Sequence, residues 1–139
     1  MASTTASVDL PVSPDAVWKL IGGFGSLPDW LAYIPESELG EGGRTRRLTN
    51  QDGGVIVERL LAFDHAARSY TYAIEQAPFP VTAYRSTLSV HEVSGIPDAS
   101  RVEWSGTFTP AGVSEREAEE LFHTIYADGL AELERTVRS

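Results

Sequence analysis

The stretch SEREAEELFHTIYADGLAELERTV, from Ser114 to Val137, sets the architecture that the rest of the chain must accommodate. Ser114 and Glu117 form a capping box, in which each side chain bonds to the backbone of the other residue, and this motif opens an α-helix. Apolar residues then recur on one broad helical face: Ala118, Leu121, Phe122, Ile125, Tyr126, Leu130, Leu133 and Val137. The sequence therefore predicts a long C-terminal helix with an apolar face that needs a partner surface.

Upstream of this helix the sequence alternates with period two, which is typical of β-strands. Strands are predicted near residues 36–41, 44–50, 54–63, 69–76, 81–92 and 100–109, after a first strand in TTASVDLPVS (residues 4–13). The segments between the six later strands are GEGG, NQDGG, DHAAR, QAPFP and VSGIPDA, all rich in turn residues. Because short turns join antiparallel neighbours, the pattern predicts a seven-stranded antiparallel sheet.

Two short helices are predicted after the first strand. Ser13 is a suitable N-cap for a helix over residues 15–21, and Pro28 opens a second helix over residues 27–34. The predicted fold class is α+β, a single domain over residues 1–139 in which a strongly curved sheet wraps around the long C-terminal helix. We expect such an arrangement to leave a cavity between the sheet and the helix.

Composition excludes several classes of function. The chain has 20 Asp and Glu residues against 11 Lys and Arg, a net charge of −9, so we expect neither nucleic-acid binding nor electrostatic membrane binding. It has no cysteine, no signal-peptide pattern and no apolar run long enough for membrane insertion. We expect a cytoplasmic monomer or weak homodimer. The basic run RTRR, with Arg44, Arg46 and Arg47, is interpreted as an exposed face.

Three short motifs resemble the START/polyketide cyclase (SRPBCC) superfamily, the helix-grip fold of the major birch pollen allergen. They are VERL (Val57 to Leu60) with the acidic turn at Asp64, YRSTLSVH (Tyr84 to His91), and Gly129-Leu130 with Leu133 in the last helix. Within the superfamily the chain most resembles the plant abscisic acid receptors and their bacterial relatives. The resemblance implies a helix-grip fold over nearly the whole chain, but the superfamily contains receptors, lipid carriers and cyclases.

The chain departs from the abscisic acid receptors at their defining positions. The receptor lysine that meets the hormone's carboxylate corresponds to a place near Pro35, and Lys19 lies elsewhere. The gate and latch loops fall at residues 50–54 and 77–81 without the receptors' own sequences. The resemblance therefore implies a pocket without that cationic anchor, and not an abscisic acid receptor.

The strand VIVERLLAFD leaves open which of its two adjacent charges faces inward. Ile56, Glu58, Leu60 and Ala62 form one face, and Val57, Arg59, Leu61 and Phe63 form the other. The family's glutamate points into the cavity, which implies that Glu58 points inward and Arg59 outward. A buried carboxylate needs hydrogen bonds or water, and we expect a hydrated cavity lined by Tyr84, Ser86 and Tyr126 to provide them. The alternative is that Glu58 faces solvent beside Arg59.

The remaining candidate ligand-binding residues lie on the expected inner surfaces. Phe122, Tyr126 and Leu133 lie on the inner stripe of the helix, with plain core packing as the alternative for each. The sheet is expected to contribute the other inward residues, which are Leu60, Tyr72, Tyr84, Ser86 and Trp104. Phe79, between Pro78 and Pro80, is interpreted as a lid residue or a hydrophobic surface turn. Gly129 either lets the sheet approach the helix or makes room for a ligand.

Metal and cofactor chemistry have no sequence support. His65, His91 and His123 lack the spacing of metal ligands, and there is no cysteine to join them, so no metal site and no cofactor are predicted. Three functions remain open: binding of a hydrophobic or amphipathic small molecule (a lipid, isoprenoid or polyketide-like compound); a cyclase or dehydratase; and a regulatory or toxin-partner protein with a vestigial pocket. In the enzyme, Glu58 would be the general acid or base and the hydroxyl of Tyr84 would polarise a carbonyl.

Overall fold

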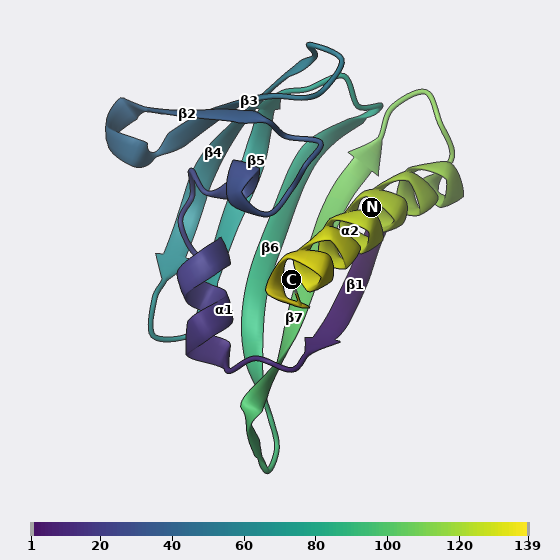
Figure 1. The fold of residues 1–139 in the computed structure, drawn as a ribbon. Helices are drawn as coiled ribbons and strands as arrows, with labels where there is room; N and C mark the ends of the chain where they lie inside the picture. The colour runs from purple at the N-terminus through teal and green to yellow at the C-terminus, as the bar shows by residue number, and fades with distance from the viewer. Residues whose placement is uncertain (1, 139) are drawn as a thin grey trace.

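The structure, a computed structural model, describes residues 2–138 and has the predicted helix-grip fold (Figure 1). Within these residues seven antiparallel strands form one sheet in the order β1-β7-β6-β5-β4-β3-β2. The strands are β1 (Ala2–Leu10), β2 (Glu36–Gly40), β3 (Thr45–Thr49), β4 (Val55–Asp64), β5 (Ser69–Gln76), β6 (Val81–Val93) and β7 (Ile96–Pro110). The helices are α1 (Pro14–Ile21), the 3₁₀ turns η1 (Leu27–Asp29) and η2 (Glu41–Gly43), and α2 (Glu115–Arg138).

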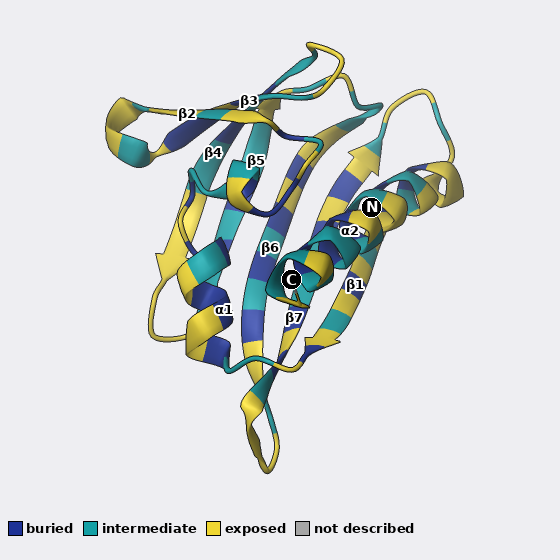
Figure 2. Ribbon diagram, in the orientation of Figure 1, coloured by how far each residue is buried: buried dark blue, intermediate teal, exposed yellow. Residues whose placement is uncertain are grey.

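Helix α2 lies along the β1 and β7 side of the sheet and turns its apolar stripe toward the concave face (Figure 1, Figure 2). The capping box forms as predicted: the Glu117 N–H donates to Ser114 Oγ at 3.1 Å, and the Ser114 N–H donates to Glu117 Oε1 at 3.3 Å. The buried residues of the stripe are Ala118, Phe122, Tyr126, Gly129, Leu130 and Leu133. The helix thereby closes one side of the curved sheet, while α1 and the segment after it cover the other end.

The second predicted helix is wrong in its length. Residues 27–34 form only the single 3₁₀ turn η1, because Trp30 has φ −140° and ψ −10°, outside the helical region. The chain then passes irregularly to Ile34, which precedes Pro35 and is therefore disfavoured from helical geometry. This irregular path matters for the site, because side chains of the segment line the cavity described below.

Two strands also differ from their predicted bounds by more than one residue. Strand β1 ends at Leu10, earlier than expected, because Ser13 already caps α1 by accepting a hydrogen bond from the Ala16 N–H. Strand β7 begins at Ile96, so the loop expected over residues 93–99 shrinks to a tight hairpin turn. Gly95 has φ +78°, the left-handed conformation that such a turn requires and glycine supplies without strain.

A β-bulge in β4 overturns the simple alternation expected for this strand. The pairing with β5 shifts between Leu60 and Ala62, which places Phe63 opposite the buried Tyr70. Because directly paired residues share a face, Phe63 lies on the side of Tyr70, where its ring stacks on Tyr70 at 6.5 Å between centroids, although Phe63 is 48% exposed at the edge of this side. The assignment of Phe63 to the outer face with Val57, Arg59 and Leu61 is therefore wrong, and the reason is the extra residue at the bulge.

Candidate functional site

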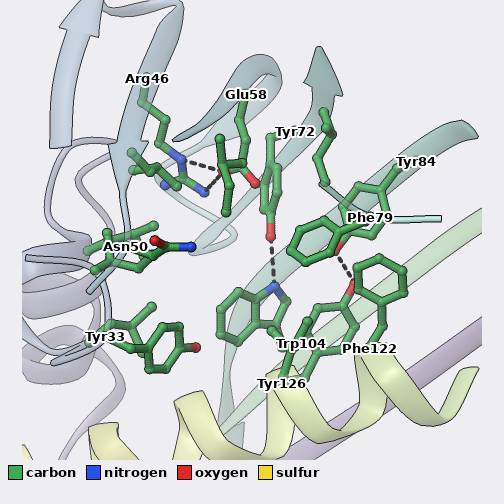
Figure 3. A pocket seen from close by; sticks show the side chains of 17 residues that line it. Tyr33, Arg46, Asn50, Glu58, Tyr72, Phe79, Tyr84, Trp104, Phe122 and Tyr126 are labelled. Atoms are coloured by element: carbon green, nitrogen blue, oxygen red, sulfur yellow. Dashed lines mark hydrogen bonds and ion pairs between the residues drawn. The ribbon is translucent and has the colours of Figure 1, made fainter. Parts of the chain in front are cut away.

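A cavity of about 180 Å³ lies between the sheet, helix α2 and the segment after η1 (Figure 3). Its wall is apolar and aromatic, with a few polar groups set into it. Seven of the predicted site residues line it: Glu58, Tyr72, Phe79, Tyr84, Trp104, Phe122 and Tyr126. Ten other residues line the cavity and were not among the predicted site residues: Leu27, Leu31, Tyr33, Ile34, Arg46, Leu48, Asn50, Ile56, Ile74 and Ile125. Binding by any of these residues stays a prediction, but their positions define where a ligand would lie.

Three predicted ligand-binding residues lie outside the cavity wall. Leu60 is partly buried and packs against the core next to the bulge. Ser86 is buried behind Trp104, from whose Nε1 it accepts a hydrogen bond at 3.1 Å, and it donates to the Ser105 carbonyl at 2.7 Å. Leu133 is fully buried in the hydrophobic core near the end of α2. The position of Leu133 fits the plain packing alternative, and its role in binding stays a prediction.

Glu58 points inward, as the resemblance implied, and the solvent-facing alternative is wrong. Its exposed fraction is 6%, and it lines the cavity, whereas Arg59 points outward to Glu75 and Glu41 at 3.0 and 2.9 Å. The group that satisfies Glu58 differs from the expected one. Instead of a hydrated cluster of tyrosine and serine hydroxyls, the carboxylate pairs with the guanidinium of Arg46, at 2.7 Å from both Nε and Nη2.

Arg46 is buried, with 1% exposed, so the interpretation of RTRR as an exposed face is wrong for this residue. The register explains the error: Arg46 pairs directly with Glu58 across β3 and β4, and Leu48, two residues on, is also buried. Alternation from Leu48 places Arg46 on the inner face, so this signal was present in the sequence. The cavity therefore does contain a cation, supplied by β3 and not at the position of the receptor lysine.

The aromatic surroundings and hydrogen bonds hold Arg46 in one place. Its guanidinium carbon lies 4.2 Å from the ring centroid of Phe24 and 4.7 Å from that of Tyr72, in cation–π geometry. Nη1 donates to the Phe24 carbonyl at 3.0 Å and to the Tyr70 hydroxyl at 3.2 Å. With the hydrogen bond from Nε to Glu58, three of the five N–H groups of the guanidinium donate hydrogen bonds, and Nη2 is in ion-pair contact with the same carboxylate.

The contacts with Arg46 use only one of the two oxygens of the Glu58 carboxylate. Both converge on Oε1, so within residues 2–138 Oε2 receives no hydrogen bond. Burial raises the pKa of the Glu58 carboxyl, and the guanidinium of Arg46 opposes that rise. The carboxylate lies beside the ring of Tyr72 in the wall of the cavity (Figure 3), which leaves Oε2 as an acceptor for a group inside it.

A second polar cluster lies deeper, between the sheet and α2. Trp104 Nε1 donates to the hydroxyl of Tyr72 at 3.0 Å, and the hydroxyls of Tyr84 and Tyr126 bond to each other (Figure 3). Burial raises the pKa values of Tyr72, Tyr84 and Tyr126, so these residues keep their protons at neutral pH. They are suited to donating hydrogen bonds and not to acting as bases.

Two loops also contribute to the cavity wall. Phe79 packs edge-on against Phe122 of α2 at 5.3 Å between ring centroids, so it is part of the cavity wall and not a free surface turn. Asn50, in the loop between β3 and β4, also lines the cavity, and its Oδ1 accepts from the Gly54 N–H at 2.6 Å. A lid motion of Phe79 stays a prediction.

Gly129 serves close packing between the helix and the sheet. A β-carbon at this position would lie 2.7 Å from Cζ3 of Trp104 and 2.9 Å from the hydroxyl of Tyr33, closer than packed atoms allow. Of the two alternatives open for Gly129, close approach is therefore correct. The glycine lets Trp104 reach the helix and form part of the cavity wall.

We expect Gly129→Ala to lower the free energy of unfolding by about 1–2 kcal/mol. Overpacking against Trp104 costs about 1–3 kcal/mol, which exceeds the gain in helix propensity of about 1 kcal/mol. Denaturant unfolding measures the difference, with Ala131→Gly on the same helix as the reference for propensity alone. A stabilised Gly129→Ala variant would contradict the packing role.

None of the three histidines lines the cavity. His65 accepts a hydrogen bond from Trp18 Nε1 at 2.9 Å, His91 lies 3.3 Å from Glu103, and His123 contacts Thr4. Over residues 2–138 no group of three or more His, Asp or Glu side chains is arranged to hold a metal ion. No helix in the same range is long and apolar enough to span a bilayer.

This fold, with its cavity between sheet and helix, defines a protein of the START/polyketide cyclase superfamily. Residues 1–138 match the family described as polyketide cyclase / dehydrase and lipid transport, and the chain belongs to that family. Membership supports a role in ligand binding or cyclase chemistry. No protein of curated function matched the sequence.

Solved structures of similar proteins share this fold. The protein XoxI from Bacillus cereus is 58% identical, with a TM-score of 0.93 over 97% of this chain and 94% of that one. A putative uncharacterized protein from Bacillus thuringiensis is 54% identical, with a TM-score of 0.96 over 99% of this chain and 100% of that one. A START superfamily protein from Mycobacterium smegmatis, at 18% identity and a TM-score of 0.77 over 99% and 98% of the two chains, shares the fold alone.

Proposed function

We propose that the protein is a cytoplasmic binding protein that holds a hydrophobic or amphipathic small molecule, such as a lipid, isoprenoid or polyketide-like compound, in the cavity between the sheet and α2. The observation that carries the proposal is an apolar cavity whose wall contains one oriented carboxylate, Glu58. Apolar walls supply affinity, and a few fixed polar groups supply orientation, which is the usual composition of a small-molecule site.

The arrangement of the polar groups supports binding in one orientation. Arg46 fixes the Glu58 carboxylate, and the hydroxyls of Tyr72, Tyr84 and Tyr126 lie in another part of the wall. An amphipathic ligand would direct its polar end to Glu58 and bury its apolar body against the aromatic rings. Phe79 and the loop at Asn50 lie where such a ligand would enter.

The cyclase or dehydratase alternative uses the same groups differently. Glu58 would transfer a proton through Oε2, while a tyrosine hydroxyl donates to a carbonyl oxygen. The observation that favours it is the set of buried tyrosines, whose raised pKa values keep them as proton donors. Burial raises the pKa of the Glu58 carboxyl, which favours it as an acid, and the guanidinium of Arg46 opposes that rise.

Native mass spectrometry of gently purified protein, followed by solvent extraction and analysis of whatever co-purifies, tests the proposal. We expect a bound hydrophobic small molecule that dissociates on unfolding. An empty protein that also fails to bind a panel of lipids and single-ring and polycyclic compounds would contradict it and favour the regulatory or toxin-partner alternative.

If the protein instead converts the compound that it binds into a different compound, the enzyme alternative holds. In that case Glu58→Gln should abolish turnover while the compound still binds.

A further inference from the structure

The volume of the cavity restricts the size of the ligand more tightly than the fold class alone does. An apolar protein cavity of about 150 Å³ accommodates benzene. A cavity of about 180 Å³ therefore has room for one ring with a short substituent. A long acyl chain or a fused system of several rings would need the wall to move apart, and close-packed interiors resist such movement.

The unpaired carboxylate oxygen of Glu58 restricts the ligand's polar group, beside the hydroxyl of Tyr33, which also lines the cavity without a hydrogen-bond partner among residues 2–138. Oε1 of Glu58 takes both contacts from Arg46, so Oε2 is the oxygen left without a partner in a residue that lines the cavity. A carboxylate oxygen only accepts hydrogen bonds. In an apolar cavity its lone pairs are best satisfied by a hydroxyl or amino group of the ligand, and a ligand lacking such a donor leaves the oxygen without a partner.

The position of Arg46 determines the charge that a ligand meets. The guanidinium bonds to Phe24, Tyr70 and Glu58 and lies over the ring of Phe24, so most of its donors are used within the protein although Arg46 lines the cavity. The pair is neutral overall, but its anionic end is the one with an unused oxygen. A ligand carboxylate placed against Oε2 would meet a like charge in a site that excludes water, and this costs more than the same contact in solvent.

Resting on the proposed function, we propose that the cavity selects single-ring compounds that carry an uncharged hydrogen-bond donor, of which phenols are the simplest class, and rejects ring carboxylates of the same size. Glu58 is the specificity-determining residue, since its Oε2 receives the donor. Arg46 is a positioning residue, because its contacts to Oε1 fix the carboxylate and leave Oε2 unpaired.

The test is binding of three compounds of nearly equal shape, measured by calorimetry or by ligand-observed NMR: 4-ethylphenol, ethylbenzene and 4-ethylbenzoate. Hydrogen bonds to charged groups are strong enough that we expect 4-ethylphenol to bind about tenfold to hundredfold more tightly than ethylbenzene. We expect 4-ethylbenzoate to bind more weakly than ethylbenzene.

The Glu58→Gln variant tests the assigned atom. It keeps the size of the side chain but replaces the anionic acceptor, so the preference for 4-ethylphenol over ethylbenzene should fall to threefold or less, while ethylbenzene itself binds as before. Glu75→Gln is the matched control: Glu75 is an exposed carboxylate on β5, paired with Arg59, and its change should leave all three affinities unaltered.

The outcomes separate the inference from the function on which it rests. If ethylbenzene binds as tightly as 4-ethylphenol, or 4-ethylbenzoate binds most tightly, the inference is wrong and the binding function stands. If none of the three binds but a larger hydrophobic compound does, the size argument is wrong. If nothing binds, both fail. The wild-type ranking decides the inference even if Glu58→Gln does not fold.

Discussion

Arg46→Met is expected to lower the free energy of unfolding by about 3–5 kcal/mol, because it leaves the charge of Glu58 buried without its partner. For a chain of 139 residues this corresponds to a fall in Tm of roughly 10–20 °C. The loss should be smaller at pH 5 than at pH 8. Burial raises the pKa of Glu58, and without Arg46 nothing opposes that rise, so the carboxyl is neutral at low pH and its charge destabilises the fold only as the pH increases.

Two further variants separate the ion pair from the loss of a large side chain. Arg47→Met, on the same strand but exposed, should change stability by less than about 0.5 kcal/mol. The double variant Arg46→Met/Glu58→Leu should recover most of the loss, since an apolar pair of similar size needs no compensation for buried charge. Denaturant unfolding at both pH values measures all three. Equal losses for Arg46→Met and the double variant would contradict the role assigned to the pair.

How much of this site the sequence could predict differs from strand to strand. On β6 and β7 the alternation was unambiguous, and Tyr84 and Trp104 lie in the cavity wall as expected. On β4 the two faces were equally apolar, so only the resemblance could place Glu58. The same strand contains a bulge, which moves Phe63 to the inner side, and one inserted residue leaves no clear mark in a short apolar run.

The cavity-lining residues that the sequence did not predict were missed for other physical reasons. Leu27, Leu31, Tyr33 and Ile34 belong to a segment whose local pattern favours a helix, but tertiary packing leaves one 3₁₀ turn and an irregular path. Helix propensity is a weak preference that packing overrides, so periodicity could not reveal which of these side chains face the cavity. Arg46 was missed for another reason: a basic run was read as exposed, although its register with Glu58 and Leu48 put it inside.

The Arg46–Glu58 pair gives this cavity a different polar group from the lysine of the abscisic acid receptors. A free lysine offers donors and positive charge to a ligand, whereas the guanidinium here makes most of its bonds to the protein. The cation is therefore used to orient an anion, and the ion pair presents an acceptor, Glu58, to the ligand. This reversal is why the charge and donor content of the ligand, and not its hydrophobicity, decide the expected selectivity.

Ile125→Trp is expected to weaken binding of both 4-ethylphenol and ethylbenzene by about 100-fold or more, because the indole would occupy the space in which the ligand's ring lies. Ile125 is half-buried on α2 and lines the cavity. An indole ring turned inward fills a cavity of this size and gains apolar contacts there, so the free energy of unfolding should stay the same or rise. Calorimetric titration and thermal unfolding of the variant measure the two effects.

Leu121→Trp is the matched control for this variant. Leu121 lies one helical turn earlier, is partly buried against the core and does not line the cavity, so its replacement should leave both affinities within about twofold of the wild type. The contrast with Glu58→Gln is informative, since that variant should affect only the phenol. Binding that survives Ile125→Trp in a folded protein would mean that the ligand lies elsewhere on the molecule, and the cavity between the sheet and α2 would then be a packing defect and not a site.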